Sequence, residues 1–159
     1  MQYTTERKKH ASDFSVMSSG LVINTTWPWL VASPDAIACD PQKGNGVVEV
    51  KCPFKCRNQS LSLAVDELPF LDHCVNGFQL KKAHAYYYQM QFQLLVTGFE
   101  WADFVVWTPT EMFVEQVARQ SDFAEQHLEW LKNFYFDHLL PALYAEIVYC
   151  RSFHMKHII

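Results

Sequence analysis

The chain has 159 residues, half of them apolar and only 19% charged, which is the composition of one globular domain and excludes wholesale disorder. Its net charge of −4 gives no broad electrostatic attraction for nucleic acid. No apolar run reaches the roughly 18 residues that cross a bilayer, and the N-terminal residues are polar rather than signal-like. We therefore expect a soluble, intracellular protein with no membrane association. The five cysteines are irregularly spaced, which is typical of reduced thiols.

Short strands are predicted first along the chain. Apolar runs bounded by Pro, Gly and polar residues predict extended segments over residues 20–24, 29–32, 36–39, 47–51, 101–108 and 112–119. The polar turn at 40–46 joins the two segments beside it into a hairpin. A Pro109-containing turn joins the last two segments into a second strand pair.

Helices are predicted in the second half. Residues 83–97 contain no Pro or Gly and end at Gly98, which predicts a helix of that extent. Residues 122–148 predict an amphipathic helix with a bend at Pro141. Residues 52–82 lack clean periodicity and predict a loop with a short helix near 60–67.

The division of the chain follows from these elements. We predict a polar N-terminal segment over residues 1–19, one folded domain over 20–148 and a C-terminal tail over 149–159. The basic run from Arg7 to His10 predicts a mobile, solvated end with at most nonspecific affinity for phosphate.

Three ionisable residues are placed where metal chemistry is feasible. Residues i and i+2 of a strand share a face, so Glu49 and Lys51 project together while Val50 faces away. A hairpin return brings Asp35 beside them. Two carboxylates, a backbone carbonyl at Val50 and a lysine form a hard oxygen site suited to Mg²⁺ or Mn²⁺. Such a metal activates water and stabilises charge on phosphate, as phosphodiester hydrolysis requires. By spacing alone, a solvated strand face is the more common explanation of a Glu-x-Lys pair such as Glu49 and Lys51.

The context of these residues carries a family resemblance. Pro34-Asp35, thirteen further residues and Glu49-Val50-Lys51 resemble the signature of the PD-(D/E)xK nucleases. The flanking motifs, in order, are WPWLVASPDAI at 27–37, GVVEVKCPFKCR at 46–57, YYYQMQFQLLVTG at 86–98 and DFVVWTP at 103–109. Together they resemble the YqaJ-like viral recombinase domain, the phage-type alkaline exonuclease branch, over residues 20–141.

The resemblance implies a fold and a set of roles. The fold is α/β with a restriction-endonuclease-like core, in which a mixed central sheet is flanked by helices. Asp35, Glu49 and the Val50 carbonyl become metal ligands, Lys51 positions the attacking water, and Gln89 reaches the site from its helix. Ser33 and Arg57 match positions that hold the 5′-terminal phosphate of DNA. The implied substrate is a duplex DNA end, and the implied assembly is a ring-shaped trimer.

Two departures from the family pattern keep an alternative open. Family members carry a preceding helix whose glutamate completes the metal site, and this sequence starts too late to contain it, since Glu6 is the only acidic residue before residue 13. Ala36 stands where the family has glycine after Pro-Asp. A truncated, catalytically silent domain that binds DNA or a protein partner is therefore the second hypothesis.

The neighbouring glutamine is expected to serve elsewhere. Gln91 lies two residues after Gln89, so on a helix the two side chains point about 200° apart and do not line one site equally. We expect Gln91 to be buried and hydrogen-bonded outside the site. Cys52, Cys56 and Cys74 lack zinc-knuckle spacing, and we adopt no zinc site.

Overall fold

The structure is a computed structural model that describes residues 2–64, 67–74 and 77–155. Its contacts divide the chain into two compact units, Met1–Gln120 and Ser121–Ile159. The domain boundaries after residues 19 and 148 stay predictions, and the last four residues of the predicted tail, 156–159, lie outside the described residues. Across the described residues, no helix is both long enough and apolar enough to cross a membrane.

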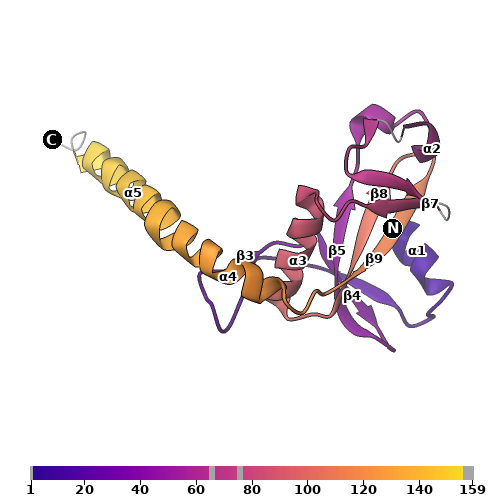
Figure 1. Ribbon diagram of the computed structural model, residues 1–159, viewed down its shortest axis with the longest axis horizontal. Helices are drawn as coiled ribbons and strands as arrows, with labels where there is room; N and C mark the ends of the chain where they lie inside the picture. Colours follow the sequence, from indigo (N-terminus) through magenta and orange to yellow (C-terminus); the bar gives the residue numbers. More distant parts are fainter. Residues whose placement is uncertain (1, 65–66, 75–76, 156–159) are drawn as a thin grey trace. The chain divides into compact units, whose positions relative to one another are not determined.

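A five-stranded mixed sheet forms the centre of the first unit (Figure 1). In spatial order its strands are β1 (Ser15–Ser18), β4 (Ala36–Asp40), β5 (Gly44–Lys51), β8 (Trp101–Trp107) and β9 (Met112–Ala118). β5 and β8 run parallel, and the other neighbouring pairs are antiparallel. The predicted mixed sheet flanked by helices is thereby confirmed.

The β4–β5 hairpin follows from its sequence. Gly44 adopts a positive φ of 74° at the turn, a conformation that a residue with a Cβ rarely takes. Ile37 then pairs with Val47, and the β-branched run continues as the buried centre of β5. The predicted hairpin and the predicted β8–β9 pair are both confirmed.

Two small hairpins accompany the sheet. One joins β2 (Val22–Ile23) to β3 (Val31–Ala32), as the short extended segments predicted. The other joins β6 (Leu71–Cys74) to β7 (Gly77–Leu80), inside the stretch that we expected to be a loop. Each of these strands has only four residues, too few for alternation to stand out. The same stretch holds the short helices η1 (Phe54–Cys56) and α2 (Leu61–Ala64), and α2 confirms the helix predicted near 60–67.

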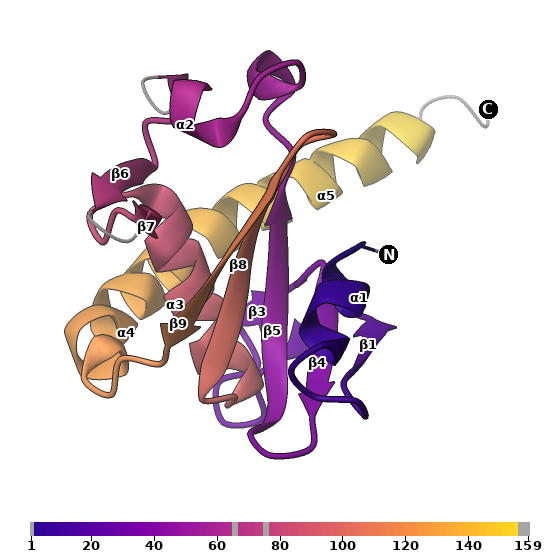
Figure 2. The ribbon, with the colours of Figure 1, turned by 90° about the vertical axis from the view of Figure 1, so that its right-hand side faces the viewer.

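The long helix α3 (Ala85–Thr97) covers one face of the sheet (Figure 2). Its N-terminus is capped by His84, whose Nδ1 accepts the Tyr86 N–H. It ends at Gly98, which has a φ of 73° and donates its N–H to the Leu94 carbonyl at 2.9 Å. The helix predicted over 83–97 is confirmed. Met90 and Leu94 of α3 pack with sheet residues such as Phe104 in the larger core.

The opposite face of the sheet is covered by α1 (Gln2–Lys8) (Figure 2). Tyr3 is buried there, and its hydroxyl donates to Asp103 Oδ2 at 2.5 Å. Arg7 Nε lies 3.1 Å from the same oxygen. The prediction that Arg7 belongs to a solvated end is therefore wrong. Tyr3 is the one buried residue of α1, and the carboxylate that it bonds lies 100 residues further along the chain. The local composition therefore did not predict that this helix packs on the sheet.

The second unit is helical. It consists of α4 (Phe123–Asn133), the π-helical segment η3 (Phe134–Leu139) and α5 (Leu140–Met155). In η3 the Leu140 N–H donates to the Tyr135 carbonyl, five residues back. Pro141 follows directly, and a proline ring obstructs the carbonyl four residues before it. The bend at Pro141 stays a prediction, and what the structure has next to the proline is the π-helical stretch that precedes it.

Candidate active site

The strand β5 carries Glu49 and Lys51 on the face that α3 covers. The alternation of a strand places both side chains on that face, and Val48 and Val50 on the other, where Val48 packs with Tyr3 of α1. Glu49 is only 4% exposed. The side chain of Lys51, at the end of the strand, keeps 19% exposure. The predicted common face of Glu49 and Lys51 is confirmed.

Three donors hold the Glu49 carboxylate. Lys51 Nζ lies 2.6 Å from Oε1, and Gln89 Nε2 also donates to Oε1 at 2.6 Å. Gln93 Nε2 donates to the other oxygen, Oε2, at 2.8 Å. Charge-assisted hydrogen bonds of this kind are the strong ones, and a buried carboxylate needs them. The cluster is therefore a fixed anionic oxygen centre beside a cation.

Lys51 is itself held from two further directions. Its ammonium nitrogen lies 3.2 Å from Gln89 Oε1, so the Gln89 amide bridges Lys51 and Glu49. The same nitrogen lies 4.4 Å from the centroid of the Tyr86 ring, within cation–π range. These contacts orient the ammonium group while leaving it partly exposed.

Asp35 joins the site through the backbone of β5. It stands just before β4, after the buried Pro34, and its Oδ2 accepts the Val50 N–H at 2.7 Å. This bond sets the Asp35 carboxylate beside the peptide group that links Glu49 to Val50. The structure thus joins Glu49, Lys51 and Gln89 through their side chains, and it joins Asp35 to the backbone of Val50 between Glu49 and Lys51.

The two glutamines that follow Gln89 on α3 point to different sides of the helix, as helical geometry requires. Gln91 is 1% exposed; its amide donates to the Ala118 carbonyl and accepts the Gln120 N–H, both at 2.9 Å. The expectation that Gln91 is buried and bonded elsewhere is confirmed. Gln93 was not among the residues predicted from the sequence. Its spacing of four residues from Gln89 places both on one helical face and was the available signal.

The two residues expected to hold the DNA end are Arg57 and Ser33. Arg57 is exposed at the end of η1, where its guanidinium sits 3.9 Å from the Phe54 ring centroid and donates to the Phe54 carbonyl at 3.1 Å. Ser33 is exposed two residues before Asp35. Among the described residues, no hydrogen bond links either one to Glu49 or Lys51.

The oxygen donors fit a hard divalent cation. Glu49 and Asp35 supply carboxylates and Val50 a carbonyl, which is the donor chemistry of Mg²⁺ and Mn²⁺. In the part of the chain that the structure describes, no three His, Cys, Asp or Glu side chains gather closely enough to hold a metal. Glu6, the early acidic residue, pairs instead with Lys9. The donors at this cluster are accordingly two side-chain carboxylates and one main-chain oxygen.

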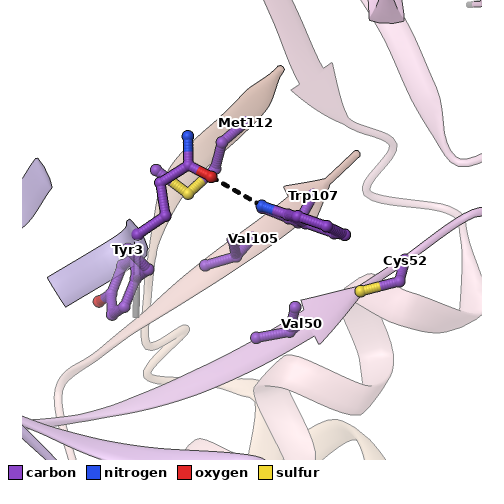
Figure 3. Close-up of a pocket in the computed structure, with 7 residues that line it drawn as sticks. Tyr3, Val50, Cys52, Val105, Trp107 and Met112 are labelled. Carbon is purple, nitrogen blue, oxygen red and sulfur yellow. Dashed lines mark hydrogen bonds between the residues drawn. The ribbon is translucent and has the colours of Figure 1, made fainter. Parts of the chain in front are cut away.

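The other face of β5 is apolar. A pocket of about 310 Å³ lies there between α1 and the sheet, lined by Tyr3, Val50, Trp107 and their neighbours (Figure 3). Across it, Trp107 Nε1 donates to Gln2 Oε1 at 2.9 Å. Because the Val50 side chain lines this pocket, Val50 offers the opposite face only its main-chain atoms.

Comparison with known proteins finds one family and similar solved structures. The model of the YqaJ-like viral recombinase domain matches residues 1–100. An alkaline exonuclease from Laribacter hongkongensis superposes with a TM-score of 0.57 at 25% identity, covering 98% of this chain and 74% of that one. The same exonuclease in complex with dAMP gives the same values. No curated protein matches. The family match includes α1, whereas the resemblance in the sequence was placed from residue 20 onward.

Proposed function

The chain belongs to the YqaJ-like viral recombinase domain family, and we propose that it is a nuclease that degrades duplex DNA from an end with Mg²⁺ or Mn²⁺ as cofactor. The observation that carries the proposal is the buried Glu49 carboxylate held by Lys51 and Gln89, with Asp35 bonded to the intervening peptide. The similarity to an alkaline exonuclease, also solved with dAMP, supports DNA as the substrate.

The cation-holding residues are Asp35, Glu49 and the carbonyl of Val50. The Glu49 carboxylate on β5 and the Asp35 carboxylate just before β4 bring opposite charge to a dication, and the Val50 N–H keeps Asp35 in place by hydrogen bonding. When bound, the cation supplies Lewis-acid stabilisation of the phosphate and lowers the pKa of a bound water. Glu49 is fixed before the cation arrives, so little rearrangement opposes binding.

Lys51 orients the attacking water. Its ammonium group has three N–H donors, and the contacts with Glu49 and Gln89 occupy two of them. The third donor is left for a water or a phosphate oxygen. The Gln89 amide contacts the Lys51 ammonium through its oxygen and the Glu49 carboxylate through its nitrogen. Gln89 therefore holds the Lys51 ammonium in position.

Ser33 and Arg57 are proposed to hold the 5′-terminal phosphate. A guanidinium can bind phosphate through two parallel hydrogen bonds, and Arg57 is exposed and stacked on Phe54 in a defined orientation. A phosphate held there selects DNA by its end, independent of base sequence.

The proposal is tested with purified protein, Mg²⁺ and linear duplexes bearing either a 5′-phosphate or a 5′-hydroxyl. Wild type is expected to shorten the 5′-phosphorylated duplex faster. Lys51→Met is expected to lose activity on both by at least about 100-fold, because general acid–base positioning contributes roughly that much. Arg57→Ala is expected to lose the preference between ends while retaining cleavage.

The matched control is Lys43→Met. Lys43 lies in the turn before β5, at the opposite end of the strand from Lys51, and bonds Gln116. This variant should cleave like wild type. Equal inactivity of wild type and Lys51→Met would contradict the nuclease proposal and favour the silent domain, whose binding to the same duplexes would then be measured directly.

A further inference from the structure

Gln93 contacts the site in a way that packing does not require. It is 4% exposed, and its Nε2 donates to Glu49 Oε2. Its own Oε1 is buried and makes no hydrogen bond among the described residues. A buried acceptor without a donor is unfavourable, and an apolar side chain of similar size would avoid it. The bond to Glu49 is therefore what favours a glutamine over an apolar residue at position 93.

The two oxygens of Glu49 are not equivalent. Oε1 accepts from both Lys51 and Gln89, whereas Oε2 accepts from Gln93. A carboxylate oxygen offers about two lone-pair directions, so Oε2 has the spare one. The Gln93 bond thereby fixes the rotation of the carboxylate and with it the direction in which the spare lone pair points.

We infer that Gln93 is a positioning residue that aims Glu49 Oε2 at the divalent cation. The inference rests on the proposed function and extends it to a residue that touches neither substrate nor cation. Outer partners of metal ligands typically change metal affinity or activity by about 10–100-fold when they are removed. Gln93 should therefore set the affinity for the cation rather than the chemistry at saturation.

Gln91 provides a matched control on the same helix. Both glutamines are buried and lie two residues apart, but the amide of Gln91 is bonded at both ends to the backbone near β9. Replacing Gln91 removes two hydrogen bonds that hold the fold together and none that reaches Glu49. The two positions therefore separate a role in the fold from a role in positioning Glu49.

The experiment measures Mn²⁺ binding to the full chain by electron paramagnetic resonance, without DNA, for wild type, Gln93→Met and Gln91→Met. We expect Gln93→Met to bind Mn²⁺ about 10–100-fold more weakly. Gln91→Met should bind within a factor of two of wild type, while its Tm falls further than that of Gln93→Met. In cleavage assays, Gln93→Met should need more Mg²⁺ for half-maximal rate but approach the wild-type kcat at saturating Mg²⁺.

The outcomes separate the two proposals. If wild type binds Mn²⁺ and Gln93→Met binds it equally well, the role of Gln93 is refuted and the nuclease proposal stands. If wild type binds no Mn²⁺ at millimolar concentration, the metal site itself fails, and the role of Gln93 with it. Should circular dichroism show Gln93→Met to be unfolded, Gln93→Asn, which keeps the amide but shortens its reach, takes its place with the same expected loss of affinity.

Discussion

Removing the hydroxyl of Tyr3 tests how firmly α1 is attached to the sheet. In Tyr3→Phe the ring stays buried and edge-on to Phe14, with centroids 5.9 Å apart, so no cavity forms. What is lost is the hydrogen bond to Asp103, whose side chain is fully buried. A hydrogen bond to a charged group contributes about 1.5–3 kcal/mol. For a chain of this size, that loss lowers Tm by about 3–12 °C.

The assay is urea unfolding followed by tryptophan fluorescence and by circular dichroism. Trp107 bonds Gln2 of α1, so fluorescence also reports on the docking of that helix. Tyr144→Phe is the control, because Tyr144 is 70% exposed in the second unit and its loss should cost under about 0.5 kcal/mol. If the unfolding free energy of Tyr3→Phe differs from that of wild type by less than this same margin, the bond to Asp103 does not anchor α1.

Two further predictions concern the same side of the sheet. Burial raises the pKa of Asp103, while Tyr3 and Arg7 oppose the rise. Because the folded-state pKa lies above that of the unfolded chain, the stability contributed by Asp103 is present at low pH and is lost as the pH rises through the folded pKa. Urea titrations should therefore show the unfolding free energy of Asp103→Asn improving relative to wild type from acidic to neutral pH; a constant difference would contradict this. In Gly46→Ala, the new Cβ would overlap the Trp101 ring, so we expect a loss of about 1–3 kcal/mol, and unchanged thermal unfolding would show that the ring moves freely.

The site residues on β5 were predictable because alternation in a strand is a strong local rule. Glu49 and Lys51 share a face for that reason alone, and the polar turn with Gly44 fixes the hairpin that brings Asp35 back to Val50. The helix α3 was equally clear, since an uninterrupted run ends at Gly98. These features depend on neighbours in sequence, which is what a sequence pattern records.

The features that were missed either depend on distant partners or are too short to give a pattern. The residues of α1 are mostly polar, and the helix is anchored by Tyr3 and Arg7 to Asp103 on β8. The β6–β7 hairpin has strands too short for a periodic signal. Gln93 is a different case. Its spacing of four residues from Gln89 is visible in the sequence, but only the structure shows that it contacts Glu49.

The separations in sequence also set the order in which the site assembles as the chain folds. Glu49 and Lys51 are two residues apart, and the Asp35–Val50 bond closes within one hairpin. The bonds from Gln89 and Gln93 to Glu49 span 40 and 44 residues, and both donors lie on α3, the helix in the crossover from β5 to the parallel strand β8. A long loop loses conformational entropy when it closes, before the contacts that compensate this loss have formed. Its closure is therefore the slow part of folding. The carboxylate thus acquires its amide donors at a less local step than its pairing with Lys51, and the loop that must close for them is the whole stretch between β5 and α3.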